Sequence, residues 1–123
     1  WSNYHYRGYA NFELKKYLDA LTDLNISVSN GDTIKHVYFM RGKIQNKLGH
    51  YKKAYIDLSS FIINDDSNDS LLSYAFQERG ISRFFLKDIN GACIDWNYSA
   101  ELGNREVISF INKNCGYISS KNE

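Results

Sequence analysis

The chain has 123 residues, a length typical of a single domain, and we expect one domain over residues 1–123. Its 15 basic and 14 acidic residues nearly balance, which gives no long-range attraction to nucleic acid or to an anionic membrane. No apolar run approaches the roughly 20 residues that a membrane-spanning helix needs, so membrane insertion is not expected. The chain begins at Trp1 without an initiator methionine, and we therefore expect a mature form or an excised part of a longer protein.

The composition favours an all-α fold. Proline is absent, helix-forming residues are spread along the chain, and no segment alternates apolar and polar residues as a strand does. The cysteines and histidines do not have the spacing of a metal site, and no catalytic or phosphate-binding motif such as Gly-x-Ser-x-Gly occurs. We therefore expect neither an enzyme nor a bound metal or cofactor.

The sequence repeats with a fixed period. Three pairs of matching residues are each 34 residues apart: Gly8 and Gly42, Tyr17 and Tyr51, and Ala20 and Ala54. From the second unit to the third the offset is 38 residues, as between Gly42 and Gly80. The four extra residues fit into the polar stretch 64–70, which we expect to form a longer loop.

Each unit is predicted to contain two helices. In the first unit, about residues 2–30, one helix ends near Leu14 and a second has apolar residues at helical spacing from Tyr17 to Val28. The second unit, about residues 35–64, repeats this pattern on either side of Gly49, a residue type that commonly ends helices. The third unit covers about residues 70–103, and a last amphipathic helix is expected over about residues 104–115.

A glycine recurs inside the first helix of every unit, as Gly8, Gly42 and Gly80. A glycine in a helix interior costs about 1 kcal/mol relative to alanine, so its repetition needs a structural reason. We expect the two helices of each unit to approach closely there, with the glycine facing an alanine of the second helix.

These features resemble the tetratricopeptide repeat family, and the resemblance covers residues 2–103. It rests on the period, on the glycines and alanines, and on an aromatic residue four positions before each glycine: Tyr4, Tyr38 and Phe76. The ending GACIDWNYSAELGN-REVISFINKNC is similar to that of tetratricopeptide proteins of Bacteroides-type bacteria. The resemblance implies a right-handed stack of three helix-turn-helix repeats plus a C-terminal capping helix. It also favours the cell envelope or periplasm over the cytoplasm.

In this chain an arginine stands before each repeated glycine, where the family usually has leucine. Each arginine precedes an aspartate by sixteen residues: Arg7 and Asp23, Arg41 and Asp57, Arg79 and Asp95. We interpret these as structural ion pairs between the two helices of a unit, because one pair repeated at one spacing is typical of internal architecture. The alternative is a row of charged groups that binds a ligand.

The two cysteines lie on either side of the turn expected at Gly103. Cys93 is ten residues before it and Cys115 twelve after it, which puts them at nearly the same height on neighbouring antiparallel helices. A disulfide is therefore allowed by the geometry. The alternative is two buried cysteines that need no partner.

The resemblance implies a non-catalytic module that binds a protein or peptide partner in the concave groove formed by the first helices. The residues expected to contact the partner are His5, Tyr9, Phe12, Phe39, Lys43, Asn46, Gln77, Ile81 and Phe85. Some of the rings on this face, above all Phe12 and the neighbouring Phe84, could instead seal neighbouring helices. The alternative function is structural, either self-association as a homodimer or service as one segment of a longer repeat array.

One subset of the family grips a C-terminal carboxylate with lysine, asparagine and arginine along this groove. At the corresponding places this chain has other residues: His5, Tyr9, Met40, Tyr74 and Glu78. A clamp for chaperone tails is therefore not expected.

Overall fold

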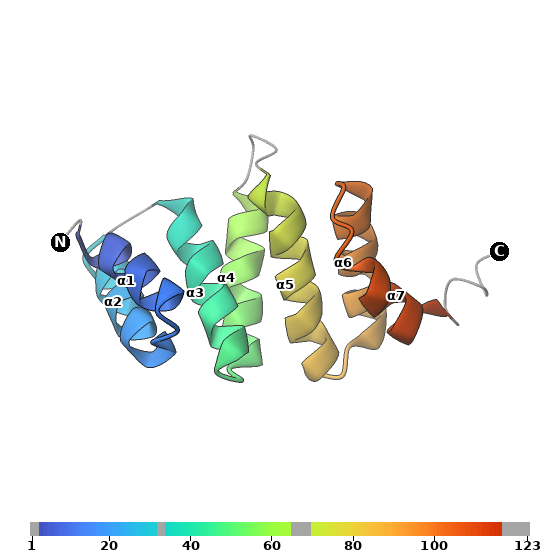
Figure 1. The fold of residues 1–123 in the computed structure, drawn as a ribbon, viewed down its shortest axis with the longest axis horizontal. Coiled ribbons are helices and arrows are strands. Elements are labelled where there is room, and N and C mark those ends of the chain that lie inside the picture. Colours follow the sequence, from blue (N-terminus) through green and yellow to red (C-terminus); the bar gives the residue numbers. More distant parts are fainter. Residues whose placement is uncertain (1–2, 32–33, 65–69, 117–123) are drawn as a thin grey trace.

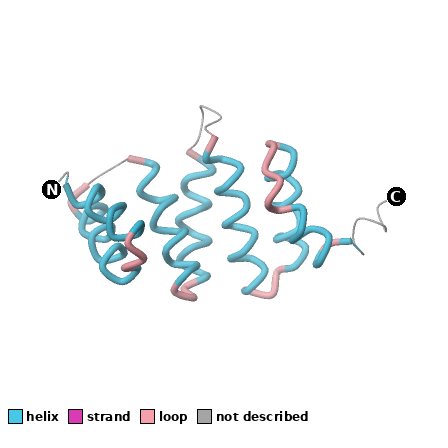
Figure 2. The backbone as a smooth tube through the Cα atoms, in the orientation of Figure 1, coloured by secondary structure: helices cyan, strands magenta, loops and turns pink. Residues whose placement is uncertain are grey.

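The computed structural model describes residues 3–31, 34–64 and 70–116, and in these residues it contains helices, turns and loops but no strand (Figure 2). The described helices are α1 (Asn3–Glu13), α2 (Tyr17–Ser29), α3 (Lys35–Lys47), α4 (Tyr51–Ile63), α5 (Leu71–Phe85), α6 (Ile89–Glu101) and α7 (Ile108–Asn114).

The helices lie side by side in a curved row (Figure 1). Consecutive helices pack in pairs, α1 with α2, α3 with α4 and α5 with α6, and α7 packs on α6 at the end of the row. Each pair corresponds to one expected repeat. The prediction of an all-α helical repeat fold is therefore confirmed.

The same turn joins the two helices of every pair. Its central residues, Lys15, Gly49 and Lys87, have φ of 60°, 81° and 72°. The next backbone N–H, for example that of His50, donates at 2.8 Å to the carbonyl oxygen five residues earlier. This is the bond that closes a helix through a left-handed residue. Glycine adopts such a φ without strain, yet the chain uses it in only one of the three turns.

The repeated glycines allow close packing of the two helices, but the side chains nearest to them are larger than the expected alanine. A Cβ added to Gly8 would lie 2.7 Å from Cδ2 of Leu24, and one added to Gly42 would lie 2.6 Å from Cγ of Leu58. At Gly80 the atoms nearest to an added Cβ belong to the indole of Trp96. The backbone oxygen of Ala20 lies 3.4 Å from the added Cβ of Gly8, and that of Ala54 lies 3.3 Å from the added Cβ of Gly42. The small residue therefore makes room for a large one.

The structure forms all three ion pairs expected from the sequence. Each arginine donates two hydrogen bonds of 2.7 to 3.1 Å to its aspartate: Arg7 to Asp23, Arg41 to Asp57 and Arg79 to Asp95. The arginine side chain is 61% exposed in the first pair but only 17% exposed in the other two. The pKa of Arg41 lies above its ordinary value, because the hydrogen bonds to Asp57 raise it more than burial lowers it. Because each arginine donates two hydrogen bonds to a carboxylate of the neighbouring helix, we interpret the three pairs as structural.

The last helix is shorter than expected. It begins at Ile108 instead of near Asn104, because the Asn104 side chain donates to Ser99 and accepts from the backbone N–H of Glu106. The chain is thereby held in a loop before α7. A disulfide between Cys93 and Cys115, with a Cα–Cα distance of 5.8 Å, fixes the other end of α7 to α6.

Candidate functional site

The residues expected to contact a partner lie on α1, α3 and α5, and the side of the stack that they define is called the inner face here. They differ in how far a partner can reach them. Tyr9, Phe12, Lys43, Gln77 and Ile81 are partly exposed, and Phe85 is exposed. His5, Phe39 and Asn46 are buried.

Phe39 is not an accessible anchor, contrary to the expectation. Its side chain is only 4% exposed and belongs to the hydrophobic core between α3 and α4. The ring lies 5.5 Å from that of Phe61, centroid to centroid. The aromatic residue at this place therefore stabilises the repeat and offers no free surface.

His5 is also buried, at 5% exposure. Its ring lies 4.1 Å from that of Tyr6 and 5.7 Å from that of Tyr9. A partner on the inner face would meet Tyr9 before it met His5. His5 is therefore corrected from a contact residue to a packing residue of α1.

Asn46 joins the second repeat to the third. Its amide nitrogen donates to the backbone oxygen of Glu78 at 2.9 Å and to the Glu78 carboxylate at 3.1 Å, and its oxygen accepts from Ser82 at 2.7 Å. Burial raises the pKa of Glu78, while the hydrogen bond from Asn46 and the charges of Lys43 and Lys47 oppose the rise. With its polar atoms engaged in this way, Asn46 is a structural residue.

Gln77 anchors the end of the stack. Its side-chain oxygen accepts a hydrogen bond from Asn104, and its backbone oxygen accepts one from the indole nitrogen of Trp96 at 3.2 Å. Its partly exposed side chain is thus engaged with the loop before α7. Gln77 holds that loop in place.

Two reachable regions remain on the inner face, and the first lies between α1 and α3. The ammonium of Lys43 sits 5.2 Å from the ring centroid of Phe12 and 6.0 Å from that of Phe39. Phe12 also packs against Tyr17, with ring centroids 5.7 Å apart. This region combines a partly exposed cation with aromatic surface.

The second region is a cleft of about 300 Å³ between α5 and α7. We call it the α5–α7 cleft. Its surface is almost entirely apolar, and the residues that line it are Ile81, Phe84, Phe85, Trp96, Phe110, Lys113 and Asn114. Two of the expected contact residues, Ile81 and Phe85, form one wall, and sequence reasoning missed the other wall on α7.

The rings around the α5–α7 cleft form a continuous row. Phe85 stacks on Tyr51 of α4 at 4.7 Å and touches Phe84 edge-on at 5.3 Å. Trp96 then bridges Phe84 and Phe110, with centroid distances of 5.9 and 5.3 Å. Because these rings support one another, the wall formed by α5 is preorganised.

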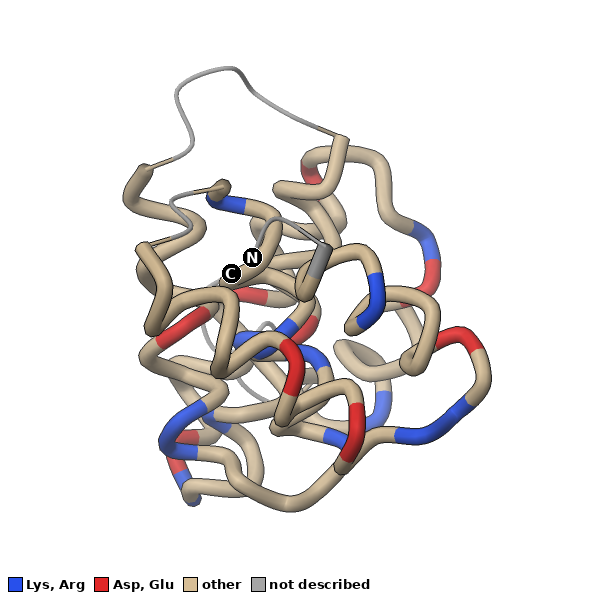
Figure 3. Tube along the Cα trace, turned by 90° about the vertical axis from the view of Figure 1, so that its left-hand side faces the viewer, with Lys and Arg blue, Asp and Glu red and all other residues tan. Residues whose placement is uncertain are grey.

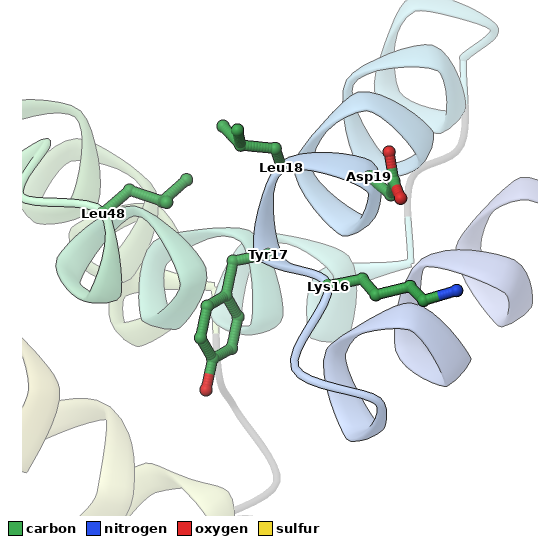
Figure 4. Close-up of a pocket in the computed structure, with 5 residues that line it drawn as sticks. All are labelled: Lys16, Tyr17, Leu18, Asp19 and Leu48. Carbon is green, nitrogen blue, oxygen red and sulfur yellow. The ribbon is translucent and has the colours of Figure 1, made fainter.

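Other clefts are less suited to binding. A cleft of about 440 Å³ lies beside the turn after α1, and its lining includes Leu18 and Leu48 (Figure 4). Its charged residues, Lys16 and Asp19, are exposed and point away from Leu48 (Figure 4). A third cleft, of about 330 Å³, has a mixed polar and apolar lining that includes the paired Arg41 and Asp57.

Among the described residues, basic and acidic positions are interspersed in the view from one end of the stack (Figure 3). None of the described helices combines the length and the apolar character needed to span a bilayer.

Known proteins with this arrangement of helices were found among solved structures. No family model matches the sequence, and no curated protein matches it. The first TPR of Spaghetti (RPAP3), bound to the HSP90 peptide SRMEEVD, is similar with a TM-score of 0.81 and 19% identity, over 94% of this chain and 90% of that chain. The second TPR domain of the human RPAP3 protein, in complex with the HSP70 peptide SGPTIEEVD, has a TM-score of 0.77 and 25% identity, over 90% and 91% of the two chains. We conclude that this chain has the fold of a tetratricopeptide repeat domain.

Proposed function

We propose that this protein is a non-catalytic interaction module that binds a peptide segment of a partner protein on its inner face. The observation that carries the proposal is the α5–α7 cleft, where exposed and partly exposed apolar side chains surround an open space. Both similar structures are peptide complexes of tetratricopeptide domains, which supports the same use of the fold here.

The partner differs in kind from a chaperone tail. At the places where the family's clamps hold a terminal carboxylate, this chain has His5, Tyr9, Met40, Tyr74 and Glu78. Of these, His5 and Glu78 are buried. The peptide is therefore held mainly by apolar contacts with Ile81 and Phe85, with Tyr9, Phe12 and Lys43 extending the contact surface.

The protein works in an oxidising compartment, the cell envelope or periplasm, in keeping with the resemblance of its ending to tetratricopeptide proteins of Bacteroides-type bacteria. The disulfide between Cys93 and Cys115 supports this location, because disulfides persist outside the reducing cytosol.

The test is a selection of random peptides displayed on phage against the immobilised domain, followed by titration calorimetry of the peptides recovered. Phe85→Ala should weaken their binding about tenfold, because a central aromatic anchor belongs to the minority of contact residues whose truncation costs more than about 1 kcal/mol. The matched control is Ile94→Ala on α6, since Ile94 is 53% exposed, against 52% for Phe85, but does not line the cleft.

Two results would contradict the proposal. One is that the intact domain retains no peptide, and the other is that both variants leave affinity unchanged or weaken it alike. A stable dimer in sedimentation that the Phe85→Ala change dissociates would instead favour self-association through the inner face.

A further inference from the structure

We infer that the α5–α7 cleft receives one large apolar side chain of the bound peptide and that Lys113 binds a carboxylate beside it. The ligand is thus a peptide in which an apolar residue such as leucine or phenylalanine is followed by aspartate or glutamate. This inference rests on the proposed peptide-binding function and deepens it.

The cleft exists because α7 leaves the stack. No Cα atom of α7 lies within 8 Å of a Cα atom of α5, whereas α7 packs directly on α6. Trp96 of α6 also lines the gap and packs against Phe110 of α7, and Trp96 itself is only 2% exposed. A volume of about 300 Å³ accepts a large side chain and is at the lower end of the range for ligand pockets.

The apolar walls define the first half of the ligand. Phe85 is 52% exposed, although its ring already stacks on Tyr51. Ile81 and Phe110 are partly exposed on opposite sides of the cleft. An apolar side chain inserted between them removes further apolar surface from water on both sides, which favours binding.

The positive charge of Lys113 indicates which residue follows the apolar one in the peptide. Among the described residues that line the cleft, Lys113 is the one charged residue and none is acidic. Lys113 is exposed and makes no ion pair of 4 Å or less with another described residue. A carboxylate next to the inserted side chain therefore finds an opposite charge with no competing acid in the lining.

The experiment uses short peptides as defined probes. The reference is Gly-Ser-Phe-Asp-Ser-Gly, acetylated and amidated to remove its terminal charges. Three further peptides replace Phe with Ala, Asp with Asn and Asp with Lys. Binding to the full chain is followed by the shifts of backbone amide signals in ¹⁵N NMR spectra, which locate the peptide and give its affinity.

The reference peptide should shift the signals of Ile81, Phe85 and Lys113. The Phe-to-Ala peptide should bind about tenfold more weakly or worse, because it loses the burial of a ring. The Asp-to-Asn peptide should bind about two- to fivefold more weakly, which is the range of an exposed ion pair, and the Asp-to-Lys peptide more weakly still.

Charge reversal supplies the matched control. Lys113→Glu should make the Asp-to-Lys peptide the better ligand, while Lys113→Gln should remove the preference between Asp and Lys. Lys52→Glu on α4 changes the net charge equally, and Lys52 is an exposed residue outside the cleft. It should leave the order of the peptides unchanged.

The contrary outcomes are distinct. If the reference peptide shifts only Tyr9, Phe12 and Lys43, the cleft assignment is overturned and the peptide-binding function stands. If none of the four peptides shifts any signal of the inner face, this inference fails, and the selection of random peptides decides the peptide-binding function separately. If deleting residues 117–123 alone shifts the cleft signals, the occupant is the chain's own tail and the inference is wrong. Cleft signals that depend on protein concentration alone would assign the cleft to a second copy.

Discussion

The side-chain amide of Asn46 on α3 donates to both the backbone oxygen and the carboxylate of Glu78 on α5, at 2.9 and 3.1 Å. One residue of the second repeat thereby satisfies two acceptors of the third. Asn46 is 8% exposed and Glu78 is 8% exposed, so water cannot easily replace these bonds.

Asn46→Ala is expected to lower the free energy of unfolding by about 2 to 3 kcal/mol, because it removes three buried hydrogen bonds and takes away the partner of the Glu78 carboxyl group, while Ser82 keeps only its longer bond of 3.3 Å to the Glu78 backbone oxygen. Urea denaturation followed by circular dichroism measures the change. Asn25→Ala is the control: Asn25 is exposed and accepts one long hydrogen bond, from Arg41 at 3.2 Å. It should cost less than about 0.5 kcal/mol. Equal losses in the two variants would contradict the bridging role of Asn46.

Glu78 should make stability depend on pH. Because burial raises its pKa, the folded protein keeps a proton that the unfolded chain releases, near the ordinary value of 4.5. The contribution of Glu78 is therefore fully present below that value and is lost as pH rises through the pKa of the folded state. Lys43 and Lys47 on α3 and Glu106 before α7 also act on this group.

The test compares Glu78→Gln with the unmodified chain in urea at about pH 4 and about pH 8, on either side of the ordinary pKa. Glutamine stays neutral and still accepts from Asn46, so the stability of the variant relative to the unmodified chain should increase with pH. A difference that stays the same at the two pH values would show that the Glu78 carboxyl group does not titrate differently in the folded state.

The turns with positive φ can be stabilised. Lys87→Gly should raise the free energy of unfolding by about 0.5 to 1 kcal/mol, because Lys87 has φ of 72° and a side chain is strained there. Lys15→Gly should act in the same direction, and Gly49→Ala should lower stability by about 1 kcal/mol. Thermal and chemical denaturation measure all three. A loss of stability on Lys87→Gly would mean that the lysine makes compensating contacts.

Reduction of the disulfide should loosen α7. The disulfide joins two residues that are 22 positions apart in the sequence. Its loss is expected to lower the free energy of unfolding by about 3 kcal/mol. Because Phe110 and Lys113 stand on α7, peptide binding at the α5–α7 cleft should weaken when a dithiol such as dithiothreitol is added. The Cys93→Ser, Cys115→Ser double variant should bind with the same weakened affinity with or without dithiothreitol. Unchanged affinity of the reduced protein would show that the disulfide does not support the cleft.

The sequence predicted the parts of the molecule that repeat. Arg41 and Asp57 were paired correctly because the same residues recur at one spacing, and such a relation is fixed within a single repeat. Phe39 was misplaced because its exposure depends on Phe61, whose ring fills the space beside it. Lys113 was missed because the direction of α7 depends on the hydrogen bonds of Asn104 and on a disulfide that the sequence merely allowed.

The unequal burial of the three ion pairs has a consequence for how the stack comes apart. In a linear array each repeat is held only by itself and its neighbours, so local opening is easiest where the units are least supported. The first pair, with its arginine 61% exposed, lies at one end, and the third, with Asp95 fully buried, lies beside the disulfide at the other. Amide hydrogen exchange should therefore be fastest in α1 and α2, and fraying should travel inward from them. The cleft at the opposite end should stay folded through these excursions, so a peptide held there as proposed should remain bound while the first repeat is open.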